Sequence, residues 1–150
     1  MIMDRPPSAE EDRSGKPFAG DAGVLLGKML AAIKLDVEDI YLGSVLPWRP
    51  AGGVPPTESD LAICLPFAER HIALAKPEFL LLCGEAAGYL MKKKASINKL
   101  RGRWAPLQFE DVAVNALPIF HPGFLLDYPS AKKQAWTDLQ LLQSAMEASQ

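Results

Sequence analysis

The sequence predicts an α/β fold in which helices cover both faces of a central, mainly parallel sheet. Short continuous apolar runs, typical of buried parallel strands, occur at residues 40–46 (IYLGSVL) and 79–84 (FLLLCG). Segments with apolar residues at helical spacing lie between and after these runs. Strands and helices therefore alternate, and crossover helices between parallel strands produce a three-layer α/β/α sandwich, for which we expect four strands.

The composition fits a single domain spanning residues 1–150, because 49% of the residues are apolar and can form a core. The net charge is -2, so any nucleic-acid contact would need a local basic patch. The two cysteines, Cys64 and Cys83, form no CxxC motif, which favours a reducing cytoplasm. No apolar run approaches the roughly 20 residues of a membrane span, and the start MIMDRPPSAEED does not resemble a signal peptide.

The first half of the chain contains two predicted helices. Residues 1–23 are rich in proline, glycine and acidic residues and predict a loop, in which Glu10, Glu11 and Asp12 would be solvated. A helix follows, with Asp21 placed to cap its first turn. After the proline-rich segment PWRPAGGVPPTESD, a second helix begins with the capping-box pattern Thr57–Asp60 and ends before Pro77.

The second half continues the alternation. The helix EAAGYLMKK follows the strand at 79–84, and a basic segment, KKKASINKLRGRW, leads to extended residues 107–109 and 112–120. The last helix covers residues 130–146. His121 comes directly after an extended run, so we expect it at the carboxyl edge of the sheet, where open α/β folds bind ligands. The alternative is that His121 only caps a turn.

Several segments together resemble one family. The GKPFAGDAG loop, the end of IYLGSVL, the residues around Arg101 to Trp104 and HPGFLL should meet at one end of the sheet. With PTESDLAICLPFAERHIALAKPEFLLLCGEAA and HPGFLLDYPSAKKQAWTDL, their order and spacing resemble the uracil-DNA glycosylase superfamily, most closely its family-4, iron–sulfur type. The resemblance covers nearly the whole chain.

The resemblance implies an enzyme of base-excision repair that flips a uracil nucleotide out of DNA and hydrolyses its N-glycosidic bond. It makes uracil-containing DNA the expected partner of a monomeric protein. His121 would donate to the developing uracil anion. Phe18 matches the aromatic residue that stacks on the flipped base; the alternative for Phe18 is a core aromatic under the loop.

The resemblance also implies residues that contact DNA. Lys99, Arg101 and Arg103, with the lysines at 92–94 nearby, would bind phosphates. The alternative is an ordinary solvated charge run. Gly123, Phe124 and Leu125 match a loop that presses into the minor groove, where apolar side chains favour base extrusion.

The sequence departs from the family pattern at two site positions. The first motif, Gly-Glu-(Gly/Ala)-Pro-Gly, contains the glutamate that orients the attacking water. Ungapped alignment pairs that glutamate with Arg5, whereas one inserted residue pairs it with Asp4, which we prefer because Asp4 is a carboxylate on the correct side of a proline. The family's base-reading asparagine is replaced by Ser44, whose hydroxyl cannot span two base atoms, so selection of uracil over cytosine should weaken.

The pattern of cluster ligands is also incomplete. Of the family's four cysteines only Cys64 has a counterpart here, and Trp48 stands where another belongs. A 4Fe–4S cluster needs four ligands, so we expect no cluster and no other metal, with Trp48 packed into the vacated space. The resemblance also implies a helix and a full first strand before this point, whereas only residues 1–3 match that strand here. Two explanations stay open: this sequence starts downstream of the true start, or the fold has lost an edge element.

Three functions remain after these observations. The first is a glycosylase with Asp4 and His121 as catalytic residues and with Phe18 and Ser44 at the base. The second is a catalytically degraded DNA-binding or base-sensing module of the same fold, which the altered first motif and the missing asparagine favour. The third is a binder of small nucleotides, for which the sequence offers no GxGxxG or P-loop motif.

Overall fold

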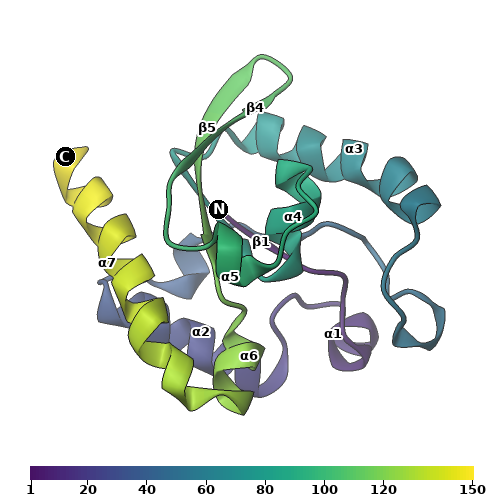
Figure 1. Ribbon diagram of the computed structural model, residues 1–150, viewed down its shortest axis with the longest axis horizontal. Coiled ribbons are helices and arrows are strands. Elements are labelled where there is room, and N and C mark those ends of the chain that lie inside the picture. Colours follow the sequence, from purple (N-terminus) through teal and green to yellow (C-terminus); the bar gives the residue numbers. More distant parts are fainter.

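The computed structural model describes residues 1–150 and has a five-stranded sheet at its centre (Figure 1). The strand order is β2-β1-β3-β5-β4. Four strands are parallel, namely β1 (Ile2–Asp4), β2 (Leu42–Ser44), β3 (Phe79–Cys83) and β5 (Val112–Ile119). The fifth, β4 (Ala105–Phe109), runs antiparallel to β5 at one edge. The predicted mainly parallel α/β sandwich is confirmed, and the expected number of four strands was one too low.

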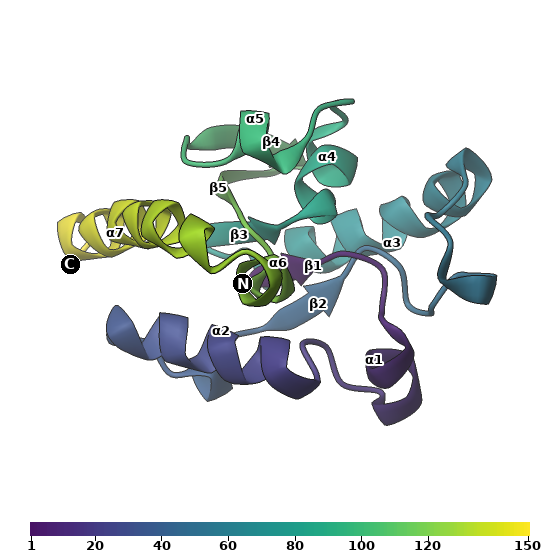
Figure 2. The same cartoon turned by 60° about the horizontal axis from the view of Figure 1, so that its bottom comes forward.

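Helices cover both faces of this sheet (Figure 2). One face packs against α2 (Gly20–Ala32), α6 (Pro122–Asp127) and α7 (Lys132–Ala148). The other face packs against α3 (Glu58–Ala75) and α4 (Glu85–Met91). Along β3 the side chains of Leu81 and Cys83 enter the first core, and those of Leu80 and Leu82 enter the second. This alternation explains why the strand is apolar throughout: it is buried on both sides.

Of the two helix starts predicted from the sequence, the start of α3 is confirmed and that of α2 is not. At α3 the expected capping box is present, because Thr57 Oγ1 accepts from the Asp60 N–H and Asp60 Oδ2 accepts from the Thr57 N–H. The prediction that Asp21 caps α2 was wrong. Its N-cap is Ala19, which makes no side-chain hydrogen bond, and Asp21 lies within the first turn, where a negative charge still favours the helix dipole.

The amino-terminal segment is more regular than its composition suggested. Residues expected to form a loop contain the helix α1 (Ala9–Ser14), which begins with a capping box between Ser8 and Glu11. Glu11 is 5% exposed, so the expectation of a solvated charge was wrong for this residue. The strand β1 lies between β2 and β3, so this short strand is a central strand of the sheet.

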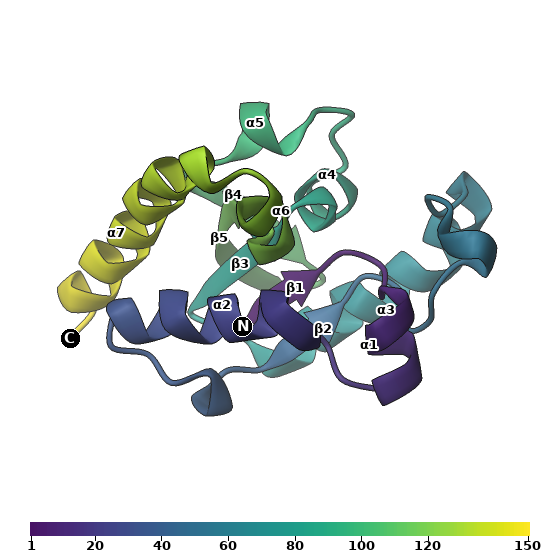
Figure 3. The same ribbon diagram turned by 90° about the horizontal axis from the view of Figure 1, so that it is seen from below.

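Four shorter elements complete the chain. The helix α5 (Ile97–Leu100) lies within the basic segment, and the 3-10 turns η1 (Val37–Asp39), η2 (Ala51–Gly53) and η3 (Pro129–Ala131) lie in connections. Viewed from below, α1 and α6 lie on the side of the molecule toward which β1 runs (Figure 3). The carboxyl ends of β1, β3 and β5 therefore open onto α1, α4 and α6, where the candidate site is located.

Candidate active site

The carboxyl ends of three neighbouring parallel strands supply the centre of the site. Asp4 is the last residue of β1, Gly84 follows β3, and His121 lies just after β5 as the N-cap of α6. Because these strands are adjacent in the order β1-β3-β5, residues far apart in the sequence meet at one edge. The position predicted for His121 from the sequence is therefore the position it has in the structure.

His121 and Asp4 form a buried pair. The Gly123 N–H donates to Nδ1 of His121 at 2.9 Å, so the neutral imidazole holds its proton on Nε2. Nε2 lies 3.0 Å from Oδ1 of Asp4, but the N–H is not aligned with that oxygen and has no hydrogen-bond acceptor. The two residues are 5% and 1% exposed. The imidazole thus holds a buried N–H that makes no hydrogen bond within the protein.

Two glycines allow the imidazole to lie where it does. Gly84 has φ +58°, and a Cβ on it would lie 3.2 Å from Cβ of His121. A Cβ on Gly123 would lie 3.0 Å from Nδ1 and 3.3 Å from Cε1 of the same ring. Any side chain at either position would push against His121. The glycines therefore shape the site by letting backbone approach the histidine closely.

Phe18 supports the opposite side of the imidazole. Its ring is stacked on that of His121, with centroids 5.6 Å apart and an angle of 16° between the planes. Phe18 is 6% exposed and has φ +53°, so the loop holds it in a left-handed conformation. A Cβ on Gly23 would lie 1.8 Å from the Phe18 carbonyl oxygen, which explains why α2 has a glycine there. No base fits between two rings at contact distance.

Arg5 is the second unsatisfied donor in the site. Its backbone N–H donates to Oδ1 of Asp4 at 2.7 Å. Its guanidinium Nη1 is 3.9 Å from Oδ2 of Asp4 and 3.8 Å from Oε2 of Glu11, and it makes no hydrogen bond. Beneath this cluster, burial above all raises the pKa of the Cys83 thiol well above its ordinary value, and the Asp4 charge adds to the effect. Cys83 is therefore an uncharged thiol at neutral pH.

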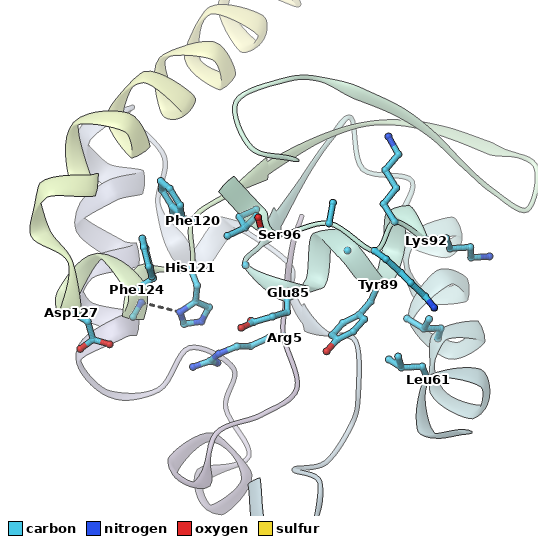
Figure 4. A pocket seen from close by; sticks show the side chains of 18 residues that line it. Arg5, Leu61, Glu85, Tyr89, Lys92, Ser96, Phe120, His121, Phe124 and Asp127 are labelled. Carbon is cyan, nitrogen blue, oxygen red and sulfur yellow. Dashed lines mark hydrogen bonds between the residues drawn. The ribbon is translucent and has the colours of Figure 1, made fainter. Parts of the chain in front are cut away.

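A cavity of about 930 Å³ opens beside these residues (Figure 4). Arg5, Gly84, Phe120, His121 and Gly123 line the end nearest the histidine–aspartate pair. Asp4, Phe18 and Ser44 do not line it. The remaining wall comes from α3, α4, the connection between α4 and α5, α5 and α6, through Leu61, Leu65, Glu85, Gly88, Tyr89, Lys92, Lys93, Lys94, Ala95, Ser96, Ile97, Phe124 and Asp127. Its size is at the upper end for a binding pocket and is larger than one pyrimidine needs.

Ser44 lies beside Asp4 but already uses its hydroxyl group. The two residues pair across β1 and β2, and Ser44 Oγ donates to the Arg5 carbonyl oxygen at 2.8 Å. The side chain thus fixes the turn after β1. The structure places Ser44 in the same cluster as Asp4 and His121, but outside the cavity wall.

Of the three basic residues expected to bind phosphate, Arg101 is already engaged within the protein. Its guanidinium donates twice to the Asp138 carboxylate of α7, at 2.8 and 2.6 Å, and once to the Gln134 carbonyl oxygen at 3.0 Å. It also lies over the Phe120 ring, 5.1 Å from the centroid. Burial raises the pKa of Asp138, although Arg101 opposes this shift. A phosphate contact by Arg101 would have to compete with this ion pair.

The other two basic residues are differently placed. Arg103 is exposed and donates to the Lys99 carbonyl oxygen at 3.3 Å, and Lys99 is exposed in α5. Neither side chain has a carboxylate within salt-bridge distance. Both cations are therefore open to solvent and to a ligand.

The residues after His121 do not form an open loop. They form α6, in which Leu125 is 1% exposed and belongs to the core, so the expected minor-groove role for Leu125 does not fit this structure. Phe124 stacks between Phe120 and Tyr128, with centroid distances of 4.9 and 4.8 Å. The neighbouring Leu126 is 42% exposed, so in this helix it is Leu126 that can contact a ligand.

Sequence reasoning missed three residues that line the cavity, Arg5, Glu85 and Tyr89, and it missed Asp138, the partner of Arg101. Glu85 follows Gly84 at the carboxyl end of β3, so the rule that placed His121 at the sheet edge could have found it. Tyr89 lies one helical turn further along the same face of α4. The partnership of Arg101 with Asp138 had no local signal, because it joins distant segments.

The cysteines do not fit the iron–sulfur cluster of the resembling family. Such a cluster needs four ligands, and this sequence contains only Cys64 in α3 and Cys83 in β3, both buried on opposite faces of the sheet. No group of three or more His, Cys, Asp or Glu side chains is arranged to hold a metal ion. The expectation that Trp48 fills a vacated cluster space was wrong, because this side chain is 51% exposed.

The fold and site define a class: an α/β sandwich with a histidine–carboxylate pair at the carboxyl edge of a parallel sheet, beside a deep cavity. The family model of the uracil DNA glycosylase superfamily matches residues 1–140. The chain belongs to this superfamily.

Curated relatives of the chain are named type-4 uracil-DNA glycosylases. The protein from Thermotoga maritima is 34% identical, in an alignment covering 80% of this chain and 62% of the relative. Those from Saccharolobus solfataricus and Archaeoglobus fulgidus are each 29% identical, covering 99% and 93% of this chain and 71% and 73% of the relatives. In the alignments with these three proteins and with two further relatives, the chain spans 62% to 74% of the relative's length.

The helices of the protein are too short or too polar to cross a lipid bilayer.

Proposed function

We propose that this protein removes uracil from DNA by hydrolysing the bond between the base and C1' of its deoxyribose. The observation that carries the proposal is the pair formed by His121 and Asp4. It combines an unpaired buried N–H with a carboxylate 3.0 Å away, at the end of a cavity that can hold a base. The names of the curated relatives support the same reaction for this chain.

His121 is the electrostatic partner of the departing base. When the glycosidic bond breaks, its electron pair leaves with the uracil ring and negative charge develops on the base oxygens. The Nε2–H of His121 donates to that charge, and the Gly123 N–H holds the ring in the required tautomer. Removing one such donor costs about 2.7–4 kcal/mol of transition-state stabilisation.

Asp4 is the carboxylate for the sugar and the water. Its negative charge stabilises the cationic sugar, and it accepts a proton from the water that adds to C1', which yields the deoxyribose hydroxyl group. Asp4 is 1% exposed, and Nη1 of Arg5, a residue of the cavity wall, lies 3.9 Å from Oδ2 of Asp4. Movement of Arg5 would admit the water.

In this proposal Phe18 and Ser44 affect the base indirectly, because Phe18 positions His121 and Ser44 positions Arg5. Phe18 stacks on the imidazole, and it reaches a base only if the two rings separate. Ser44 holds the Arg5 carbonyl oxygen and offers no amide to read the uracil edge. We therefore expect weaker selection of uracil over cytosine than an asparagine would give.

DNA contacts come from both sides of the cavity. Lys99 and Arg103 bind phosphates, because their charges are not neutralised within the protein. On α6, Gly123 allows close approach and Phe124 and Leu126 supply the apolar surface that separates bases. The chain acts as one domain and as a monomer in this proposal.

A second function, DNA or base binding without catalysis, is favoured by one observation. Both Asp4 and Ser44 are tied to Arg5, through the Arg5 N–H and the Arg5 carbonyl oxygen. If Arg5 does not move, water cannot reach the carboxylate, and the site binds DNA without cleaving the glycosidic bond.

One assay separates the two functions. End-labelled single- and double-stranded oligonucleotides with one uracil are incubated with the protein and treated with alkali, which cleaves abasic sites. Strand scission at the uracil supports the glycosylase. Binding of the same oligonucleotides without scission, even at stoichiometric protein, supports the binding module and refutes the catalytic proposal.

A further inference from the structure

The cavity continues well beyond His121, and the half far from His121 is lined by leucines, a tyrosine and lysines. Leu61 and Leu65 of α3 form its apolar floor, and Tyr89 of α4 stands beside them (Figure 4). Lys93 and Lys94, in the connection after α4, border it. One flipped base near His121 would leave this half empty.

Tyr89 presents an unused aromatic ring to the cavity. Figure 4 shows its side chain extending beside Leu61 into the open space. The ring stacks on no other aromatic residue, and the hydroxyl group has no hydrogen-bond partner in the protein. Burial, reinforced by the nearby Glu85 carboxylate, raises the pKa of Tyr89, so the phenol is neutral at ordinary pH. A neutral aromatic face over apolar side chains suits a stacked base.

The lysines differ in whether their charge is free. Lys92 pairs with Glu69, with 3.2 Å between Nζ and Oε1. Lys93 and Lys94 are exposed and lie within salt-bridge distance of no carboxylate. Two uncompensated cations therefore border the part of the cavity that holds Tyr89, and they can bind the phosphates on either side of a nucleotide stacked there.

We propose that this far half binds an unpaired nucleotide next to the uracil nucleotide, with its base against Tyr89 and its phosphates at Lys93 and Lys94. The inference rests on the proposed function, because it extends the same site along the DNA strand. In a duplex each base is stacked and paired, so a recessed ring such as Tyr89 reaches only a base that is already free. The structure thus assigns single-stranded or locally opened DNA as the preferred substrate.

Binding measured by fluorescence anisotropy tests this inference, independently of excision. Tyr89→Leu should weaken binding of a short single-stranded uracil oligonucleotide about tenfold, since loss of base stacking has effects of this order. Binding to the matched duplex should change less than about twofold. The control is Tyr41→Leu, which removes an exposed tyrosine just before the amino end of β2, at the opposite end of the strands from the site.

A charge test uses the two exposed lysines and does not depend on packing. Lys93→Ala/Lys94→Ala should reduce the salt dependence of single-strand binding by about 1.4 in log–log slope, since each phosphate contact contributes about 0.7. Lys28→Ala/Lys34→Ala, in α2 and just after it, removes the same charge from exposed positions and should leave the slope nearly unchanged.

The outcomes separate this inference from the proposed function. Selective loss of single-strand binding supports the inference even if the wild-type protein releases no uracil. If the wild type releases uracil but Tyr89→Leu binds both DNA forms as the wild type does, or weakens both equally, the inference is wrong and the glycosylase proposal stands. An unchanged salt slope in the Lys93/Lys94 variant also overturns the inference.

Discussion

Nε2 of His121 lies 3.0 Å from Oδ1 of Asp4, although β5 and β1 bring these residues from opposite ends of the chain. Because the Gly123 N–H occupies Nδ1, the proton of the neutral ring is on Nε2, the nitrogen that faces the carboxylate. This pair is the part of the molecule on which the proposed chemistry depends.

Replacing His121 should reduce activity far more than stability. His121→Ala should lower single-turnover uracil release by about 10²- to 10³-fold, the effect of one lost donor to a developing anion. His121 is also the N-cap of α6, so the alanine variant loses an acceptor for the Gly123 N–H and about 1 kcal/mol of stability. His121→Asn, which restores a cap acceptor, should recover stability in urea denaturation. If its excision also returned to the wild-type level, the assigned role of His121 would be wrong.

Gly123→Ala should lower activity because the added methyl group displaces the His121 ring. The new Cβ would lie 3.0 Å from Nδ1 of His121, so the ring must shift and uracil release should fall at least tenfold, since about 1.4 kcal/mol corresponds to one decade. Gly27→Ala in α2 is the matched control, because a Cβ there meets nothing within 4 Å. It should raise stability by about 0.5–1 kcal/mol and leave excision unchanged. Equal excision by the two variants would argue against close packing at Gly123.

Arg101→Met should destabilise the protein by about 3–5 kcal/mol, because it leaves the buried Asp138 carboxylate without its partner. Arg101→Met/Asp138→Leu should recover most of that loss, and urea denaturation of both variants measures it. Full stability of the single variant would show that the pair is not a support of α7.

The same pair predicts a dependence on pH. Burial raises the pKa of Asp138 in the folded protein. Ionisation of this carboxyl group therefore lowers the free energy of unfolding. Its unfavourable effect is absent below the unfolded pKa, near 3.8, and grows as the pH rises through the raised folded pKa. Removing Arg101 raises that pKa further. The Arg101→Met penalty should therefore be smaller in mild acid than at neutral pH; a penalty that grows in acid would contradict this assignment.

Both cysteines should resist modification in the folded protein. Cys64 and Cys83 are buried, and burial keeps the Cys83 thiol protonated. Under native conditions a thiol-specific reagent such as 5,5'-dithiobis(2-nitrobenzoic acid) should react much more slowly than in urea, where both thiols become available. Rapid reaction of either thiol in the native protein would show that its core opens readily.

The sequence predicted the parts of the fold and site that depend on local pattern. The apolar run of β3, the capping box at Thr57 and the position of His121 after a strand all follow from residues close together in the chain. The choice of Asp4 required the family resemblance and one inserted residue, and the structure places Asp4 beside His121.

What the sequence did not predict depends on contacts between distant segments. Leu125 matched a loop pattern, yet the Pro-Gly start made a helix and turned this leucine into the core. Arg101 belonged to a basic run, but its partner Asp138 lies on α7, which only the fold brings near. Glu11 lies in a segment whose composition predicts a loop, but its capping box with Ser8 makes it a buried residue of α1.

The most direct test of the central claim is single-turnover uracil release by the wild type, Asp4→Asn, His121→Ala and the double variant, at matched folded protein. Groups that act as a unit show strongly non-additive losses. We predict measurable release by the wild type, a large loss in each single variant, and a double variant not much worse than the poorer single one. Release that is equal in all four proteins would contradict the assignment of the Asp4–His121 pair as the catalytic centre.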